Sequence, residues 1–391
     1  MKILMIHPHD IYSDFEPWTV RITFLAREFV KRGHEIKLVY HLLNPQSLEE
    51  TRDRQEYPFQ TIPLVRYQFT LLKKFGLIHE LAKWADVIHF QKCFPHTSLP
   101  AIYAGYRLNK PIHYDWDDWE YEIYQYRPLN RAVGISLNTV ERAIPKLVDT
   151  ISVASEGLRQ LCLSLGVRKD RIFEAHVGAD LDRFSPDISG EDIRRYHDLE
   201  GKVVLYLGQL HGAQYLELFL RAAKVMLDRR QDVTFLVVGS GERFGELHRF
   251  TEELGIGHRV VFTGSVGHNL VPKYIALADV TVACFEDNKQ TRCKSPLKIA
   301  EYLASGKAIV ASDVGEVRRM VSGCGILVKP GDVGLLVDGM EKFLDDPQLT
   351  REMGRRARKR AEEKYNWSVT ASNILRAYWV ALEDHSFRKP Y

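Results

Sequence analysis

Short apolar runs separated by amphipathic stretches recur along the first half of the chain. Between the first two runs, residues 18–31 place Ile22, Leu25, Ala26 and Phe29 on one helical face. A strand, a helix and a strand in succession predict a β-α-β unit with a right-handed crossover. The predicted strands of this half are 3–6, 36–40, 87–90, 112–114 and 151–153. Continuous apolar runs of this length are typical of strands buried on both faces of a parallel sheet.

The second half repeats this alternation more regularly. Its predicted strands are 203–207, 235–238, 260–262, 280–282, 308–310 and 326–328. Two such series predict two doubly wound, Rossmann-like α/β domains, one over 1–180 and one over 181–367. The joint is expected near 177–186, where Gly, Asp and Pro cluster.

Composition narrows the class of protein. The chain has 391 residues, 45% hydrophobic and 27% charged, with a formal net charge of +3. This balance argues against disorder, and the charge is too small to indicate a nucleic-acid partner. Five cysteines without short spacing suit a reducing compartment. We therefore expect a cytoplasmic protein without a membrane-spanning segment.

Two open α/β sheets imply where ligands bind. In such sheets the ligand lies beyond the carboxyl ends of the strands, and helix N-termini there favour phosphate. Two facing domains would each hold one ligand. Residues Gly239-Ser240-Gly241 follow a predicted strand, but Phe244 stands where a dinucleotide fingerprint needs its third glycine. We interpret this segment as a tight turn.

The most informative stretch runs from Cys293 to Lys307. Ser295 can cap a helix and Pro296 suits the first helical position, which leaves the early amides free for phosphate oxygens. Lys298 adds a positive charge in the first turn, where the helix dipole disfavours it unless an anion binds. Glu301 lies one turn further on and can accept hydrogen bonds from a ribose diol. The alternative is an ordinary capped helix with a surface Lys and Glu.

Several stretches taken in order resemble the retaining GT-B glycosyltransferases of family 4. The similar segments are 1–4, 25–28, 31–36, 176–186, 237–242, 261–266 and 296–306. The resemblance implies a nucleotide-sugar donor on the C-terminal domain and an acceptor on the N-terminal one. It also implies a final helix, about 368–391, that returns to the N-terminal domain.

The resemblance further assigns roles to individual residues. Glu301 matches the glutamate that holds the donor ribose, and Ser295, Pro296 and Leu297 match the amides that hold the diphosphate. Gly241 and Val266 fall on the nucleotide-side turns. The family needs no metal and no further cofactor, because protein groups neutralise the leaving diphosphate.

The chain departs from the family pattern at its usual cations. Gln209 replaces an arginine, Gln214 falls near a lysine position, and His211 is the remaining candidate cation of that loop. Cys293 replaces the first glutamate of a pair, eight positions before Glu301. Two alternatives follow: Lys294 and Lys298, helped by Arg292, supply the charge for catalysis, or the chain is a non-catalytic partner subunit.

Residues His113 to Glu120 form the most unusual segment of the N-terminal half. Asp115 and Asp118 are the candidate catalytic carboxylates, and Trp116 and Trp119 can stack on acceptor sugar rings. The alternative is an acidic loop whose tryptophans anchor it to the core. His7 and His9 end the first strand and are expected to line the acceptor side. A metal site is not predicted, because the surrounding pattern is that of GT-B.

A basic amphipathic stretch, 66–84, completes the pattern. It can lie on an anionic membrane surface, which would suit a lipid-linked acceptor, or pack on the sheet as an ordinary helix. The sequence thus predicts a metal-independent retaining glycosyltransferase that uses a glycan or lipid-linked acceptor. A non-catalytic GT-B subunit and a sugar-nucleotide 2-epimerase are the alternatives.

Overall fold

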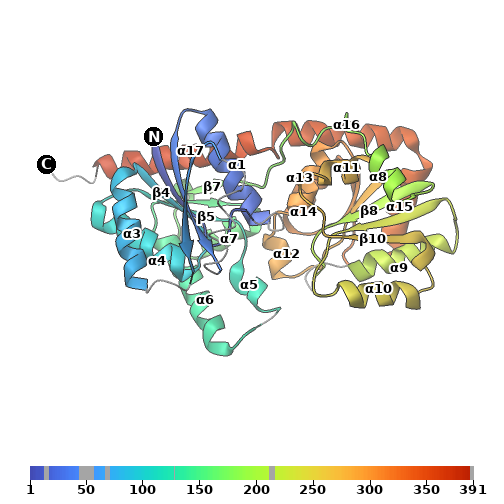
Figure 1. The fold of residues 1–391 in the computed structure, drawn as a ribbon, viewed down its shortest axis with the longest axis horizontal. Helices are drawn as coiled ribbons and strands as arrows, with labels where there is room; N and C mark the ends of the chain where they lie inside the picture. The colour runs from blue at the N-terminus through green and yellow to red at the C-terminus, as the bar shows by residue number, and fades with distance from the viewer. Residues whose placement is uncertain (13–16, 44–56, 67–70, 127, 211–215, 388–391) are drawn as a thin grey trace. The chain divides into compact units, whose positions relative to one another are not determined.

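The computed structural model describes residues 1–12, 17–43, 57–66, 71–126, 128–210 and 216–387. The chain divides into two units, shown in Figure 1. Unit 1 comprises Met1–His176, Cys293–Ser295 and Trp367–Tyr391, and unit 2 comprises Val177–Arg292 and Pro296–Asn366. Each unit is built on one parallel sheet.

The sheet of unit 1 has seven strands in the order β3-β2-β1-β4-β5-β6-β7. They are β1 (Lys2–Ile6), β2 (Glu35–Leu42), β3 (Gln60–Val65), β4 (Val87–Gln91), β5 (Ile112–Trp116), β6 (Thr150–Val153) and β7 (Ile172–Glu174). The order reverses between β1 and β4, because the chain winds outward from β1 in both directions. This reversal point is where an open α/β sheet offers a crevice for ligands.

Helices cover this sheet on both faces. They are α1 (Pro17–Lys31), α3 (Leu71–Trp84), α4 (Pro95–Leu108), α5 (Glu120–Tyr124), α6 (Arg131–Ala143), α7 (Glu156–Ser164) and α17 (Trp367–Phe387). The predicted helix over 18–31 is confirmed as α1, and Gly33 follows it with φ of +77°. Strand β3 falls in a stretch for which the sequence pattern gave no clear strand, since Pro63 interrupts its apolar run.

The sheet of unit 2 has six strands in the order β10-β9-β8-β11-β12-β13. They are β8 (Lys202–Leu207), β9 (Val233–Val238), β10 (Val260–Gly264), β11 (Val280–Ala283), β12 (Ala308–Ser312) and β13 (Ile326–Val328). Its helices are α8 (Glu191–Tyr196), α9 (Leu216–Leu227), α10 (Phe244–Glu253), α11 (Val271–Ala276), α12 (Lys289–Cys293), α13 (Leu297–Ala304), α14 (Gly315–Val321), α15 (Val333–Asp345) and α16 (Pro347–Glu363). The order reverses between β8 and β11, so the equivalent crevice lies there.

The last helix, α17, returns to unit 1, as the family resemblance implied. Trp367 at its start stacks on Phe24 of α1, with ring centroids 5.7 Å apart. Further along, the Tyr378 hydroxyl lies 2.7 Å from Nδ1 of the buried His89 in β4. The N-terminal sheet is therefore completed by the end of the chain.

Helix α3 contains most of the basic stretch, and its inner face packs on unit 1. Its buried positions, Lys74, Ile78 and Ala82, face the unit 1 interior, and Phe75 packs edge-on against Tyr103 of α4. Outward-facing Lys83 instead pairs with Glu80. The described side chains of α3 thus pack as an ordinary helix on its own unit. Across the described residues, no helix is long and apolar enough to cross a membrane.

Candidate functional site

The carboxyl edge of the unit 2 sheet is built from close backbone contacts. A Cβ at Gly239 would lie 2.0 Å from the Gly208 carbonyl oxygen, and one at Gly241 would lie 2.3 Å from that of Leu210. Gly239 also has φ of +134°, which side chains rarely adopt. The segments after β8 and β9 therefore touch through glycine. Gly239 forms a bridge with Gly264, and the tight turn begins at Gly241, whose carbonyl oxygen accepts from the amide of Phe244 at 3.0 Å, two residues later than expected. Gly241, predicted on the donor side, is exposed there.

Glu301 is the central carboxylate of this edge. It lies on α13 with 4% of its surface exposed, and its Oε1 is 2.8 Å from Nε2 of His268. His268 belongs to the loop after β10, two residues beyond the half-buried Val266. The structure thus brings two predicted donor-binding elements, Glu301 and the Val266 loop, together through His268. A buried carboxylate with a free oxygen is suited to accept hydrogen bonds from a diol.

Lys298 is buried beside the reversal point of the same sheet. Its ammonium lies 4.5 Å from the Tyr206 ring of β8 and 5.7 Å from the Phe285 ring that follows β11. Such cation–π contacts attract an ammonium to the ring faces and help to hold it in place. Gln209 is half-buried and lies two residues after the end of β8. His211 and Gln214 lie outside the described residues.

The start of α13 differs from the predicted capped helix. Pro296 has ψ of 120° and occupies the cap position without a side-chain hydrogen bond, so the helix begins at Leu297. Ser295 is buried and groups with unit 1 rather than capping the helix. The predicted cap at Ser295 and first helical position at Pro296 are therefore wrong by one residue. The extended backbone of Pro296 explains this, since residues at helix caps are non-helical.

The carboxyl edge of the unit 1 sheet is built instead from buried charges. Asp115 accepts two hydrogen bonds from Arg21, both at 2.7 Å, and a third from the Ser152 hydroxyl at 2.5 Å. Asp115 is fully buried, and although burial opposes ionisation, Arg21 holds its pKa well below the ordinary value. Both oxygens of the Asp115 carboxylate are thus hydrogen-bonded within the fold. The prediction that Asp115 is a catalytic residue does not fit this position.

Trp116 is also a core residue. It is fully buried and stacks on Tyr114, with centroids 5.7 Å apart, because alternate residues of β5 share one face. Its indole N–H donates to Glu141 at 3.0 Å. Trp116 therefore cannot stack on a sugar, which corrects that prediction. Trp119 is half-buried and packs on the same core, as the anchoring alternative proposed.

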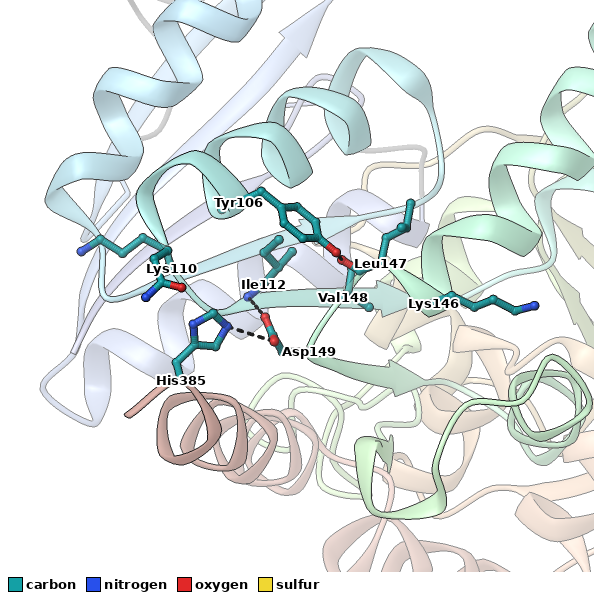
Figure 2. A pocket seen from close by; sticks show the side chains of 10 residues that line it. Tyr106, Lys110, Ile112, Lys146, Leu147, Val148, Asp149 and His385 are labelled. Carbon is teal, nitrogen blue, oxygen red and sulfur yellow. Dashed lines mark hydrogen bonds and ion pairs between the residues drawn. The ribbon is translucent and has the colours of Figure 1, made fainter. Parts of the chain in front are cut away.

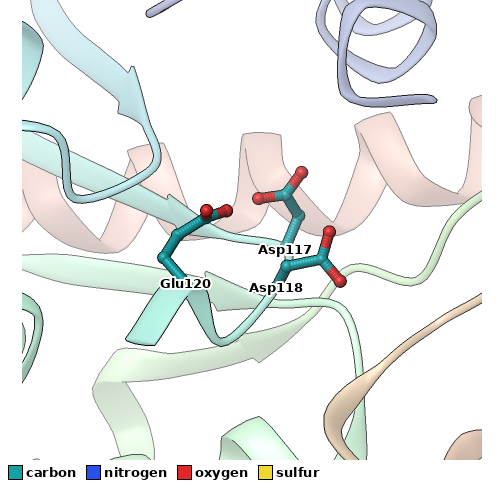
Figure 3. Close-up of side chains that lie close together, drawn as sticks. All are labelled: Asp117, Asp118 and Glu120. Atoms are coloured by element: carbon teal, nitrogen blue, oxygen red, sulfur yellow. The ribbon is translucent and has the colours of Figure 1, made fainter. Parts of the chain in front are cut away.

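Three acidic side chains gather where β5 passes into α5: Asp117, Asp118 and Glu120 (Figure 3). The ammonium of Lys92, which follows β4, forms ion pairs with all three, at 3.3 Å from Asp117 and 3.7 Å from Asp118. Lys92 is 2% exposed. The acidic cluster thus already contains a cation supplied by the chain. Asp118, with 19% of its side chain exposed, is the member with most access to a ligand.

Lys294 joins this acidic cluster rather than the donor helix. The segment Cys293–Ser295 groups with unit 1, and the Cys293 carbonyl accepts a 2.6 Å hydrogen bond from the Ser155 hydroxyl. Burial lowers the pKa of Lys294, while Asp118 and Glu120 favour its charged form. The ammonium of Lys294, which was predicted to bind the donor, is therefore attracted by Asp118 of unit 1.

Burial raises the pKa of Glu120 within this cluster and of Glu141 beside it. It raises that of Glu120 to about 7, where Lys92 opposes the rise and Asp118 adds to it. It raises that of Glu141 to about 8, with repulsion from Glu120 contributing. Glu141 lies on α6 and accepts from the amides of Glu120 and Tyr121, both at 2.8 Å. It thereby fixes the start of α5 and the acidic cluster with it.

His7 lies beneath this edge and is not exposed. Its Nδ1 is 2.8 Å from the side-chain oxygen of Gln91, whose amide donates to Asp117 at 2.8 Å. Burial holds the pKa of His7 well below its ordinary value. His7 is therefore connected to the acidic cluster through Gln91 but cannot contact an acceptor directly. His9, at the same strand end, is partly exposed.

Sequence reasoning missed Arg21, Lys92 and Glu141. Each lies in a different element from its partner, and Arg21 and Asp115 are 94 residues apart. The available signal was a charged residue within an otherwise apolar stretch or at the end of a predicted strand. Parallel pairing of β4 with β5 would have joined Lys92 to the acids.

A surface hollow of about 300 Å³ lies elsewhere on unit 1, near the amino ends of its strands (Figure 2). There His385 of α17 lies 2.9 Å from Asp149, which also accepts from the amide of Ile112. None of the predicted site residues lines it. The carboxyl edges remain the candidate sites.

Comparison with known proteins agrees with this geometry. Residues 19–183 match the family described as Glycosyltransferase Family 4, and residues 191–360 match Glycosyl transferases group 1. The D-inositol 3-phosphate glycosyltransferase of Corynebacterium diphtheriae is 26% identical, over 97% of this chain and 94% of that protein. The match to alpha-D-kanosaminyltransferase of Streptomyces kanamyceticus, also 26% identical, spans 48% of each chain.

Solved structures show the same fold. Sucrose-phosphate synthase from Thermosynechococcus elongatus superposes with a TM-score of 0.78 at 21% identity, covering 98% of this chain and all of that one. HepE of Anabaena, in complex with UDP and glucose, gives 0.73 at 18% identity, covering 96% and 98%. Matches to two successive glycosyltransferase models, together with this fold, identify the chain as a GT-B glycosyltransferase of family 4.

Proposed function

We propose that the protein moves a sugar from a nucleotide-sugar donor to a glycan or lipid-linked acceptor, with retention of configuration. The carrying observation is the buried Glu301 carboxylate, held by His268 on the helix that follows the reversal point of unit 2. That position is the expected one for a nucleotide in an open α/β sheet. The complex of HepE with UDP and glucose supports the same class of donor.

Glu301 would bind the ribose diol and the α13 amides the diphosphate. A thermal-shift screen of UDP-, GDP- and ADP-sugars tests this, because a bound ligand stabilises the fold in proportion to its affinity. One nucleotide series should raise the melting temperature. Glu301→Gln should weaken its binding about 10–100-fold, since a buried charged hydrogen-bond acceptor is lost. The exposed Glu253→Gln is the matched control and should leave binding unchanged.

Lys298 would stabilise the charge of the departing diphosphate in place of a metal. The attacking acceptor hydroxyl forms the new glycosidic bond as the sugar–phosphate bond breaks, and a leaving phosphate oxygen takes its proton. Transfer should then persist in EDTA, and Lys298→Met should lower kcat by about 10²–10³, as for other preorganised charge stabilisers. Loss of activity in EDTA with recovery in Mg²⁺ would contradict this part.

Retention is tested on the product. The anomeric coupling constant of the newly formed linkage, read by NMR at early times, should match that of the donor sugar. An inverted product would exclude the proposed stereochemistry while leaving donor binding intact.

A second candidate function is that of a non-catalytic partner subunit. Gln209 and Cys293 favour it, because each replaces a charged residue of the family pattern, and Cys293 packs in the unit 1 core. Transfer or donor hydrolysis by the purified chain that Glu301→Gln abolishes would exclude this candidate. Donor binding without turnover would favour the partner-subunit candidate if turnover appeared when a second glycosyltransferase was added.

A lipid-linked acceptor would bring the protein to a membrane surface. Because the described inner face of α3 packs on its own unit, its outer residues Lys73 and Lys83 are the available contacts. Co-sedimentation with vesicles containing anionic lipid tests this proposal. Binding that survives Lys73→Glu with Lys83→Glu would assign the contact elsewhere.

A further inference from the structure

A second group of basic side chains lies at the carboxyl edge of the unit 1 sheet. We call it the basic cluster: His41 of β2, Arg66 after β3, Lys74 of α3 and His96 in the first turn of α4. The rings of His41 and His96 are 4.8 Å apart, and Lys74 donates to the backbone carbonyl of Arg66. Four different elements thus converge on one place.

Lys74 is a buried cation without a carboxylate. It is 3% exposed, and its hydrogen bond goes to the Arg66 carbonyl. Within the described ranges, no acidic oxygen lies within ion-pair distance of its ammonium. Burial lowers the pKa of Lys74, and the nearby Arg66 lowers it further. A buried charge is normally paired, so this one points to a counter-ion that the chain does not supply.

His41 presents an unpartnered nitrogen to the same place. Nδ1 of His41 lies 2.8 Å from the His7 carbonyl oxygen and therefore donates a hydrogen bond to it. In the neutral ring Nε2 is then unprotonated and carries a lone pair that can accept a hydrogen bond. Nε2 is buried, has no hydrogen-bond partner, and belongs to a side chain that is 2% exposed. His96 is arranged similarly. Its Nε2 donates a hydrogen bond to the Pro8 carbonyl oxygen at 3.2 Å, so Nδ1 is the unprotonated nitrogen that can accept. The cluster therefore offers acceptors as well as cations.

The described groups that act electrostatically on His41 and His96 are basic. Burial lowers the pKa of His41 to about 4, and Lys74 and Arg66 lower it in the same direction. Burial likewise lowers that of His96 to about 2, again with His41, Arg66 and Lys74 contributing. Both imidazoles are thus held neutral beside two cations. A ligand that suits this place carries negative charge and at least one acidic hydrogen.

We propose that the basic cluster binds a phosphate monoester group, through the Lys74 and Arg66 cations and a proton shared with His41 or His96. A monoester has acidic oxygens for the cations and, with its second ionisation near pH 6, an O–H for an imidazole lone pair. Sulfate and phosphodiesters lack that proton. The inference rests on the proposed function, in which this edge receives the acceptor: the acceptor then carries a phosphate monoester beside the sugar-accepting hydroxyl.

The test uses the full chain with inorganic phosphate and sulfate as probes. Isothermal titration calorimetry gives affinities, and ¹H–¹³C spectra of the histidine rings locate binding. Phosphate should move the His41 and His96 signals and bind at least tenfold more tightly than sulfate. Lys74→Met should weaken phosphate binding at least tenfold. Lys83→Met, on the same helix but exposed and paired with Glu80, is the matched control and should have no effect.

Several outcomes would overturn the proposal: no phosphate binding, equal binding of phosphate and sulfate, or equal affinity in the Lys74 and Lys83 variants. Lys74→Met exchanges a buried ammonium for an apolar side chain of similar length, so its melting temperature checks folding. Arg66→Gln, at a partly exposed position, repeats the test if that variant unfolds. Nucleotide-sugar binding through Glu301 is measured separately. If it persists without phosphate binding, the inference fails and the proposed function stands.

Discussion

The carboxyl edges of the two sheets are built from different kinds of residue. In unit 1 the strand ends carry buried ionisable side chains, including the Arg21–Asp115 pair and Lys92 within three acids. In unit 2 the turns after β8 and β9 meet through the backbone of Gly208 and Gly239. One edge depends on charge balance and the other on close approach.

This difference teaches what each unit can recognise. Backbone amides and a helix start suit a diphosphate, whose shape is the same in every nucleotide sugar. Side-chain networks can be altered one residue at a time, which suits an acceptor whose chemistry varies. The same difference implies that the two units lose stability by different physical routes.

The largest expected effect comes from breaking the buried pair of unit 1. Asp115→Ala leaves Arg21 charged and buried without its carboxylate, which typically costs about 3–5 kcal/mol. Calorimetric unfolding should show the unit 1 transition at a lower temperature and the unit 2 transition unchanged. Asp170→Asn removes an exposed partner of Arg168 and should cost less than about 1 kcal/mol. Equal shifts of both units would contradict the comparison.

Acid should unfold unit 1 before unit 2. Seven histidines of unit 1 have lowered pKa values, chiefly through burial: His7, His9, His34, His41, His89, His96 and His113. Below the unfolded pKa of 6.5, the unfolded chain takes up protons that the folded unit refuses, so stability falls by up to about 1.4 kcal/mol per pH unit and group. In unit 2, His197 is the histidine, among the described ones, with a lowered pKa.

Glu120 and Glu141 act in the opposite sense over part of this window. Their raised pKa values favour the folded state as pH falls from about 8 toward 4.5. Seven histidines outweigh the three acids of unit 1 with raised pKa values, Asp117, Glu120 and Glu141, so the net change below pH 6.5 is destabilising. Hydrogen exchange of each unit at pH 7 and pH 5 measures this directly, and faster opening of unit 2 at pH 5 would refute it.

A substitution at the edge of unit 2 should instead lower stability by steric overlap. Gly239→Ala places a Cβ 2.0 Å from the Gly208 oxygen at φ of +134°, and should cost about 2–3 kcal/mol and weaken nucleotide binding. Gly245→Ala is the control, since it lies in α10 with open space around its Cβ and should be neutral or slightly stabilising. The unit 2 transition should move, with no change in its pH dependence.

The smallest expected effect sharpens the charge argument within unit 1. Glu141→Gln removes one of the acids whose raised pKa values oppose acid unfolding. The loss of unit 1 stability between pH 7 and pH 5 should therefore become steeper, by about 1 kcal/mol per pH unit. Thermal unfolding at several pH values measures the slope. The partly exposed Glu156→Gln on α7 should leave that slope unchanged, and a shallower slope in Glu141→Gln would contradict its raised pKa.

The sequence predicted the fold well because alternation of apolar runs is a local signal. The eleven predicted strands, helix α1 and the position of Glu301 on a helix needed no information beyond neighbouring residues. The unit 1 edge was predicted less well. Asp115 and Trp116 are adjacent in β5 and both fully buried, and sequence cannot tell an acid facing a ligand from one facing Arg21.

The return of α17 to unit 1 has a consequence for synthesis on the ribosome. All of unit 2 has been made once Asn366 is added, whereas unit 1 still lacks the helix whose Tyr378 meets His89, 289 residues earlier. The half that is translated first is thus the last to be finished. A chain that stops early leaves the histidine-lined interior of unit 1 uncovered, so nascent or truncated products are marked for recognition by chaperones and proteases.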